Sequence, residues 1–357
     1  MKTLLLLGAF LLSHSLIHAQ ADSLHTSWKI EGYLETYYTF VANQSTHSRP
    51  NFVYSHNRSN EVGINLGFLK ASYQNSELRA NISMGTGTYM NANYSAEQGV
   101  LKNLYEANIG VKVARKIPLW VDMGVMPSHI GFESAVSKDC WTLTRSLLAD
   151  NSPYFETGAK VSYNSPNEKW FVALLLLNGW QRIQLLDGNN SPAWGHQVSY
   201  KPNAKWMFNS SSYLGSDKAD SVKQMRYFHN FYASYQATKR LGFILGMDYG
   251  LEQQQGSKHY AHWYTPILIC QVRPHTNGAI AGRIEYYHDN TGVIIATGTP
   301  NGFQTWAYSI NYDYRLNEKV LWRVEARTFQ SKDAIFVHDQ TLQRYETFFT
   351  TSLAISL

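Results

Sequence analysis

The residues of this sequence that could do chemistry are charged side chains at every second position of predicted strands. Arg323, Glu325 and Arg327 alternate with Val324 and Ala326, for example. Because successive side chains of a β-strand point to opposite faces, such charges share one face of their sheet. The charged residues assigned to that face are Glu31, Glu35, Arg79, Glu106, Lys112, Asp122, Glu156, Lys160, Arg283, Glu285, Asp313, Arg315, Arg323, Glu325 and Arg327.

This charged face has two interpretations. With both signs mixed, it could line a water-filled channel that has a weak charge preference. The same side chains could instead form ion pairs between strands that only stiffen the wall, which is the commoner role for any single residue. A pore dedicated to anions would carry a ladder of Arg or Lys alone, and residues 323–327 alternate in sign instead.

Catalysis is the weaker interpretation of the polar residues. His288 is placed on the outward face near the outer end of its strand, and Ser309 lies on the next strand, as an outer-membrane lipase would need. The sequence does not bring the two together, and a nucleophile needs an adjacent base. Cys140 and His129 share one loop but have no orienting third residue. We therefore expect no enzyme activity.

Metal, cofactor and disulfide chemistry receive little support. His259 and His262 form a His-x-x-His pair, which is more typical of a solvated loop than of a metal site. We expect no cofactor. Cys140 and Cys270 are the two cysteines. They do not make a disulfide framework, and the sequence leaves open whether they pair.

The elements that position the charged face are predicted strands. Residues 28–40 and 345–357, near the two ends of the chain, both alternate strictly between two faces. In a closed barrel the last strand pairs with the first and leaves no edge. The pattern predicts an all-β fold, a closed antiparallel transmembrane β-barrel of about 16 strands (roughly 14–18).

The connections between predicted strands alternate between short and long. Outer-membrane barrels have short periplasmic turns and long external loops, whereas a soluble sandwich has no reason to keep such an alternation. The short connections are residues 74–77, 115–118, 164–168, 201–205, 238–240, 273–277 and 316–319. The long connections are residues 41–59, 88–103, 127–153, 178–191, 215–225, 253–261, 289–302 and 330–344.

Tryptophans mark the predicted periplasmic ends of the strands. Trp28, Trp170, Trp206 and Trp322 each fall there with outward parity, as in the aromatic girdle of a membrane barrel. Trp120 lies at the same depth, but its parity predicts an inward-facing side chain.

Composition agrees with a wall that is apolar outside and wet inside. Aromatic residues make up 14% and charged residues 16% of the 357 residues, whereas a charged share of about 25% is typical. Beyond the N-terminus, no run reaches the roughly 20 apolar residues that a membrane-spanning helix needs. The net charge of +5 comes without a basic run, which argues against a nucleic-acid partner.

The N-terminus resembles a secretory signal. Lys2 precedes an apolar run from Leu4 to Leu12, and cleavage is expected near Ala19. We therefore divide the chain into a signal peptide at residues 1–19 and one β-barrel domain at residues 20–357.

The long connection at residues 127–153 is the predicted constriction of the barrel. It is the longest of its set, and residues 141–148 are compatible with a helix. It could fold into the lumen or lie over the mouth as a lid, because the position of a loop does not fix its pose. Its polar candidates are His129, Glu133, Lys138, Asp139, Arg145 and Asp150.

Several short motifs resemble the OmpL-like β-barrel porins. They are Gly124–Glu133, Thr144–Ser146, Pro153–Lys160 and Asn178–Trp180. The resemblance spans the mature chain and implies a single-chain barrel, inserted by the barrel-assembly machinery into the outer membrane of a Gram-negative bacterium. Leu357 departs from the Phe that is common at the C-termini of such barrels.

The sequence thus predicts an outer-membrane porin that lets small hydrophilic solutes or ions diffuse through a water-filled barrel. Its partners would be the outer-membrane lipid and those solutes. The sequence leaves open whether the protein forms a homo-oligomer. The first alternative is a non-conducting barrel whose surface loops, such as residues 89–94, bind ligands or other surfaces. The second is an outer-membrane lipase.

Overall fold

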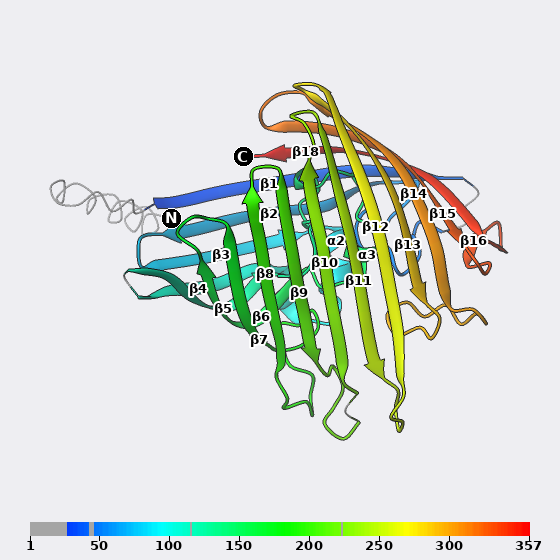
Figure 1. Cartoon of the computed structure of the whole chain (residues 1–357). Coiled ribbons are helices and arrows are strands. Elements are labelled where there is room, and N and C mark those ends of the chain that lie inside the picture. Colours follow the sequence, from blue (N-terminus) through cyan, green and yellow to red (C-terminus); the bar gives the residue numbers. More distant parts are fainter. Residues whose placement is uncertain (1–26, 43–45, 115, 223) are drawn as a thin grey trace, which may run out of the picture.

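The computed structural model describes residues 27–42, 46–114, 116–222 and 224–357. In these ranges the chain forms a closed antiparallel barrel of sixteen strands and a separate two-stranded hairpin (Figure 1). The predicted fold class and strand number are confirmed. The predicted signal peptide at residues 1–19 lies outside the described residues.

The longest strand of the barrel is β12, with 16 residues, and the shortest is β7, with 8. Their bounds are β1 (Ser27–Val41), β2 (Val62–Gln74), β3 (Leu78–Thr86), β4 (Leu104–Ala114), β5 (Ile117–Pro127), β6 (Phe155–Asn164), β7 (Trp170–Leu177), β8 (Ala193–Asn203), β9 (Trp206–Gly215), β10 (Arg226–Gln236), β11 (Leu241–Gln253), β12 (Tyr260–His275), β13 (Gly278–Asp289), β14 (Phe303–Arg315), β15 (Val320–Ser331) and β18 (Tyr345–Ser356).

The remaining elements lie in the long connections. They are the helices α2 (Thr88–Asn93) and α3 (Leu147–Asp150), the 3₁₀ turns η1 (Gly99–Asn103) and η2 (Ser137–Asp139), and the hairpin of β16 (Phe336–His338) and β17 (Thr341–Gln343). No helix among the described residues is long and apolar enough to cross a bilayer.

The barrel closes where its first and last strands meet. β1 and β18 pair from Tyr33 with Ser356 to Val41 with Phe348, and β18 also pairs with β15. Every strand therefore has two neighbours, so the barrel leaves no row of unpaired backbone groups at an edge.

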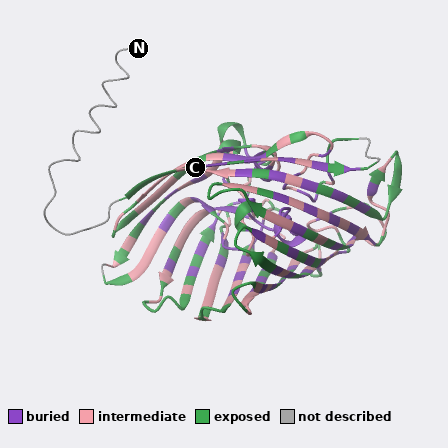
Figure 2. Cartoon of the chain, turned by 90° about the horizontal axis from the view of Figure 1, so that it is seen from above, coloured by how far each residue is buried: buried purple, intermediate pink, exposed green. Residues whose placement is uncertain are grey.

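Side-chain alternation separates an apolar outside from a polar inside. On β11, Leu245 and Met247 are exposed, whereas Ile244 and Asp248, on either side of this pair, are buried. Figure 2 shows the same banding of buried and exposed residues along most strands. Because the strand period is two, one pairing register places all lipid-facing residues outside.

The tryptophans lie where the sequence predicted them. Trp170 stacks on Tyr200 and Trp206 on Tyr235, each with ring centroids 4.1 Å apart, near the short turns and on the outer face. Trp120 instead points inward, with the guanidinium of Arg79 4.4 Å from its ring.

One irregularity in β2 places a polar side chain inside. Glu35 pairs with Leu66 and Thr36 with Ile64, so that Asn65 has no partner in β1. The buried Asn65 amide donates to Glu35 Oε2 at 2.9 Å. An extra residue of this kind redirects a side chain that strict alternation would place outside.

The outward face predicts a depth-dependent cost for charge. We expect Leu245→Arg, between the two aromatic rims, to lower the free energy of unfolding in lipid vesicles by about 2–4 kcal/mol. Leu251→Arg, on the same face of β11 but close to its long-loop end, is the matched control and should cost about 0–1 kcal/mol. Urea titration, with unfolding monitored by tryptophan fluorescence, measures the free energy of unfolding of both variants. Equal costs would contradict a membrane-facing β11.

Candidate functional site

The long connection at residues 127–153, called the inner loop below, lies inside the barrel. Its start bonds to β6 and β9, where His129 contacts Glu156 and the carbonyl of Ser212. Further along, the Thr144 N–H donates to Glu325 on β15. These partners face inward from strands around the ring, so the loop occupies the lumen, as a constriction would, and is not a lid over the mouth.

Arginines on one side of the wall bind the backbone carbonyls of the inner loop. Arg323 donates to the carbonyls of Ser137 and Cys140, the latter at 2.9 Å. Arg283 donates to the Thr144 carbonyl at 2.8 Å. Arg327 donates to the carbonyl of Arg145 at 2.7 Å. The three guanidiniums hold an irregular backbone that has few partners of its own.

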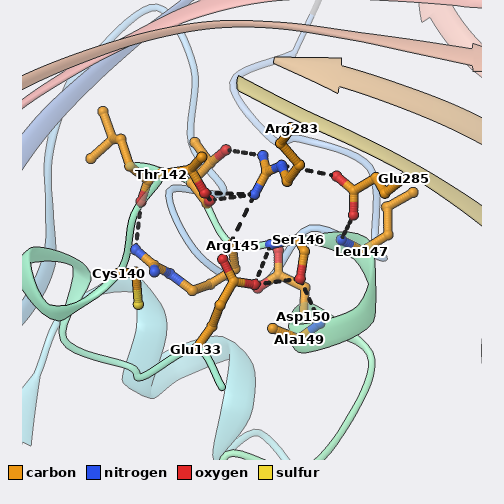
Figure 3. A network of polar contacts seen from close by, with 12 residues as sticks. Glu133, Cys140, Thr142, Arg145, Ser146, Leu147, Ala149, Asp150, Arg283 and Glu285 are labelled. Atoms are coloured by element: carbon orange, nitrogen blue, oxygen red, sulfur yellow. Dashed lines mark hydrogen bonds and ion pairs between the residues drawn. The ribbon is translucent and has the colours of Figure 1, made fainter. Parts of the chain in front are cut away.

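Acidic and amide side chains of the same wall accept hydrogen bonds from N–H groups of the loop. Glu325 accepts from the Thr144 N–H at 2.6 Å, and Asn311 from the Leu143 N–H at 3.0 Å. Glu285 accepts from the Leu147 N–H at 2.6 Å, as Figure 3 shows.

The same charged residues also pair with one another. Arg283 lies 3.0 Å from Glu325, and Arg327 lies 2.5 Å from Glu285. The side chains of all four are at most 1% exposed. Buried charges are tolerated only when they are paired and their remaining hydrogen-bonding groups are satisfied. The loop backbone supplies many of those remaining partners.

The helix within the inner loop is shorter than predicted. The sequence is compatible with a helix at residues 141–148, but α3 spans only Leu147–Asp150. Ser146 caps it, since its hydroxyl accepts from the Ala149 N–H at 3.1 Å, and Glu133 accepts from both the N–H and the hydroxyl of Ser146. Wall side chains bind backbone groups of residues 143–145, so the intrahelical hydrogen bonds do not form there.

His129 fixes the start of the inner loop with both ring nitrogens. Nδ1 lies 2.7 Å from Glu156 Oε2, and Nε2 lies 2.8 Å from the Ser212 carbonyl oxygen. Both partners are acceptors, so only the protonated imidazolium donates to both. Although burial alone would lower it, the pKa of His129 is raised, because Glu156 and the Ser212 carbonyl favour the charged form.

Gly195 on β8 makes room for this imidazole. A Cβ at position 195 would lie 2.9 Å from two atoms of the His129 ring.

Asp150 fixes the other end of the inner loop. Its Oδ1 accepts from the Ser55 N–H and from the Tyr154 hydroxyl, both at 3.3 Å. Burial raises the pKa of Asp150 to about 7, in spite of the nearby charges of Arg327 and Arg145.

The remaining loop candidates lie in different surroundings. The buried Arg145 donates to the Leu143 carbonyl at 2.5 Å, and its Nε and Nη1 have no hydrogen-bond partner among the described residues. Lys138 is exposed and donates to Ser356 Oγ at 2.6 Å, at the end of β18. Asp139 is exposed in η2.

On the opposite wall, formed by β2 to β5 and called the wet wall below, charged side chains are partly exposed to solvent. Lys70 lies 2.5 Å from Glu106 and is 23% exposed, and Arg79 lies 2.5 Å from Asp122 and is 28% exposed. The Arg283 side chain on the other wall is 0% exposed. The inner loop therefore packs against β13 to β15 and leaves Lys70 on β2 and Arg79 on β3 partly accessible to solvent.

Sequence reasoning missed several of these side chains. Lys70 alternates with Leu69 and Ala71, so strand parity alone could have found it. Asn65 could not be found in this way, because the irregularity in β2 reverses its parity.

The structure does not bring the candidate lipase residues together. His288 pairs with Gln304 on β14, whereas Ser309 pairs with Arg283, five positions further along β14. Across the described ranges, no group of three or more His, Cys, Asp or Glu is arranged to hold a metal ion.

The two cysteines do not pair. Both are free thiols, with Cys140 buried in the inner loop and Cys270 on β12. Burial raises the pKa of Cys140 to about 11, which keeps the thiol protonated and unreactive at neutral pH.

Comparison with known families decides the identity of the barrel. Residues 27–357 match the model of a family described as "Putative beta-barrel porin-2, OmpL-like". The chain belongs to this porin family. The resemblance read from its short motifs is thereby confirmed. No curated protein matches the chain by sequence.

Solved structures share the fold of this OmpL-like porin at low sequence identity. The anion-selective porin from Comamonas acidovorans is 11% identical, with a TM-score of 0.60 over 93% of this chain and 100% of that one. OmpT of Vibrio cholerae is 10% identical, with a TM-score of 0.60 over 95% and 99% of the two chains. The channel DcaP of Acinetobacter baumannii is 6% identical, with a TM-score of 0.60 over 96% and 100%. Identities this low show a common fold alone.

The buried anchors predict unequal costs for removing an arginine. We expect Arg323→Leu to destabilise the barrel by about 3–5 kcal/mol, because it leaves two loop carbonyls without their donor and the Asp313 carboxylate without its cation. Arg79→Leu on the wet wall is the matched control and should cost less, because solvent replaces part of its contacts. Denaturant unfolding in detergent compares them, and a larger loss for Arg79 would refute the anchoring role.

The raised pKa of Asp150 predicts a pH dependence of stability. The folded protein holds this proton up to about pH 7, whereas an unperturbed Asp releases it near 3.8. Stability from the protonated form is therefore fully present below about 3.8 and is lost as the pH rises through about 7. Asp150→Asn should raise the melting temperature at pH 8 and reduce the difference between pH 5 and pH 8.

Asp139→Asn, on the exposed η2, is the control for this measurement and should keep the wild-type pH profile. An Asp150→Asn variant with an unchanged profile would show that this carboxyl is already ionised at pH 5.

Proposed function

We propose that this porin lets small hydrophilic solutes and ions diffuse across the outer membrane through a lumen narrowed by the inner loop. The observation that carries the proposal is a loop anchored inside a closed sixteen-strand barrel. A barrel of about 16 strands is wide enough for an aqueous channel. The inner loop then limits the size of what passes.

The passage is proposed to follow the wet wall. Lys70, Glu106, Arg79 and Asp122 project inward from β2 to β5 and include the partly exposed ion pairs. The pore-lining role expected from sequence for Arg79, Glu106 and Asp122 fits this wall, and Lys160 lies next to it on β6. Arg283, Glu285, Arg323, Glu325 and Arg327 instead hold the loop.

Weak charge selectivity follows from the mixed signs on the wet wall. Lys70 and Arg79 there each have a carboxylate, Glu106 and Asp122 respectively, at 2.5 Å. An anion or a cation that passes therefore meets both charges together, which differs from a one-sign ladder.

Assembly is the second part of the proposal. OmpT of Vibrio cholerae, one of the similar folds, is known in a trimer form. That likeness supports a homo-oligomer of this porin. The barrel-assembly machinery would insert the chain into the membrane.

One observation favours the non-conducting alternative. Loops at the long-loop end pack into the mouth, where Phe52 contacts Phe303 and Phe329 with ring centroids 4.7 and 5.6 Å apart. Arg49 also lies 2.6 Å from Glu346, with both side chains at most 2% exposed. These contacts cover part of the mouth beside β14, β15 and β18, on the side where the inner loop is also anchored.

Single-channel recording tests the proposal. The purified protein in a planar bilayer should give discrete conductance steps that are linear with voltage. Replacing residues 134–149 with a short Gly-Ser linker should raise the step size at least twofold, because it removes the segment that fills the lumen. Replacing residues 254–259, between β11 and β12, is the matched control and should leave the step size unchanged. Folded protein without any conductance would favour the barrel with binding loops.

A further inference from the structure

Four polar side chains gather on the outward face of the neighbouring strands β8, β9 and β10 (Figure 1). Their orientation follows from adjacent residues that face the lumen. Gly195 faces the ring of His129, since a Cβ there would lie 2.9 Å from two ring atoms. Ser211 and Asn230 bond to the inner loop. Because successive side chains of a strand alternate between its faces, the polar side chains that face the membrane are those of His196, Ser210, Ser212 and His229.

These four side chains, called the outer polar cluster below, form one chain of hydrogen bonds. Ser212 Oγ lies 2.5 Å from His196 Nδ1. Ser210 Oγ lies 3.4 Å from His196 Nε2 and 3.1 Å from His229 Nε2. The chain ends at His229, which is exposed and whose Nδ1 has no hydrogen-bond partner among the described residues. One polar nitrogen therefore faces the membrane unsatisfied.

The outer polar cluster lies near the middle of the bilayer. Trp206 and Tyr235 stack at the periplasmic rim of the same strands. Ser210 is four residues from Trp206, and His229 is six residues from Tyr235. With a rise of about 3.4 Å per residue and a strand tilt of about 40°, these side chains lie roughly 10 and 15 Å above the rim. The apolar band of such a barrel is about 25 Å tall.

This depth excludes lipid headgroups and ester hydrolysis as the use of the cluster. Headgroups and ester bonds lie at the two interfaces of the bilayer, and its core holds no water. Acyl chains form no hydrogen bonds, so lipid alone leaves the Nδ1 of His229 unsatisfied, which is costly in hydrocarbon. A partner that brings polar groups to this depth is itself a protein that spans the membrane.

The wall is also low beside the cluster. β7, which pairs with β8, has 8 residues, whereas β12 has 16. Eight residues of a tilted strand span roughly 20 Å, which is less than the apolar band of about 25 Å. A wall shorter than the bilayer is accommodated by thinning of the lipid or by oligomerisation. The short strand and the outer polar cluster thus favour the same arc of the barrel for a contact with protein.

We propose that a second copy of this chain packs against the outward face of β8 to β10, with its own outer polar cluster against this one. Each imidazole and hydroxyl can both donate and accept hydrogen bonds. The cluster is therefore complementary to itself, as a symmetric contact requires. Its two serines are small and let the second copy approach closely. The inference rests on the proposed function, whose second part is a homo-oligomer.

Association of the full chain in lipid vesicles tests this surface. Energy transfer between donor-labelled and acceptor-labelled chains, measured at several protein-to-lipid ratios, gives the dissociation constant. His196→Leu combined with His229→Leu should raise this constant at least tenfold, because polar contacts between the copies are lost. The matched control is His262→Leu combined with His288→Leu. It replaces two outward histidines near the long-loop ends of β12 and β13 and should keep the constant within twofold.

Single substitutions separate hydrogen bonding from shape and serve if the double variant does not fold. His229→Gln keeps a donor and an acceptor and should change the dissociation constant less than twofold, whereas His229→Leu should raise it at least threefold. Heat-modifiable migration in gel electrophoresis checks that each variant is folded. A wild-type chain that stays monomeric at every ratio, or equal effects of the two histidine pairs, would overturn the proposal.

Single-channel recording distinguishes this inference from the proposed channel. Oligomers that depend on the outer polar cluster but give no conductance would leave the contact surface in place and refute the channel. Conductance from a chain that is monomeric in vesicles would leave the channel in place and refute the contact surface.

Discussion

An irregular backbone inside a barrel must find partners for its N–H and C=O groups, and this requirement organises the structure. The inner loop has little helix of its own, so its polar groups depend on the wall. Arg323 and Arg283 donate to its carbonyls, and Glu325 accepts from one of its N–H groups. Without them, buried peptide groups would be left unsatisfied, at a cost similar to that of losing the hydrogen bonds.

The wall also depends on the inner loop. Charges as deeply buried as Arg327 and Glu285 are costly unless each hydrogen-bonding group has a partner, and the loop supplies partners to both. The loop and the wall of β13 to β15 therefore form one unit. Because the loop is held on that side, water remains at Lys70 and Arg79 on the other. The position of the proposed passage follows from where the loop is anchored.

Strand parity made much of this predictable, because it depends only on neighbouring residues. Alternation placed Arg323, Glu325 and Arg327 on the inner face, and the spacing of turns and loops gave the barrel. The partners could not be predicted, since Arg323 binds the carbonyl of Cys140, 183 positions away. The predicted helix at residues 141–148 failed for the same reason: distant wall residues compete for its backbone groups. That competition cannot be predicted from the residues next to residues 141–148 in the sequence.

The two ends of the inner loop respond to pH in the same direction. His129 holds its two acceptors only while protonated, and its pKa is raised, so its contribution is lost as the pH rises through that value. Burial of Asp150 costs least free energy while its carboxyl is protonated, and the stability that this protonated form contributes is lost as the pH rises through about 7. A histidine and an aspartate usually act in opposite senses. Here both weaken the hold on the loop as the pH increases, because the histidine needs its charge and the aspartate needs to lose it.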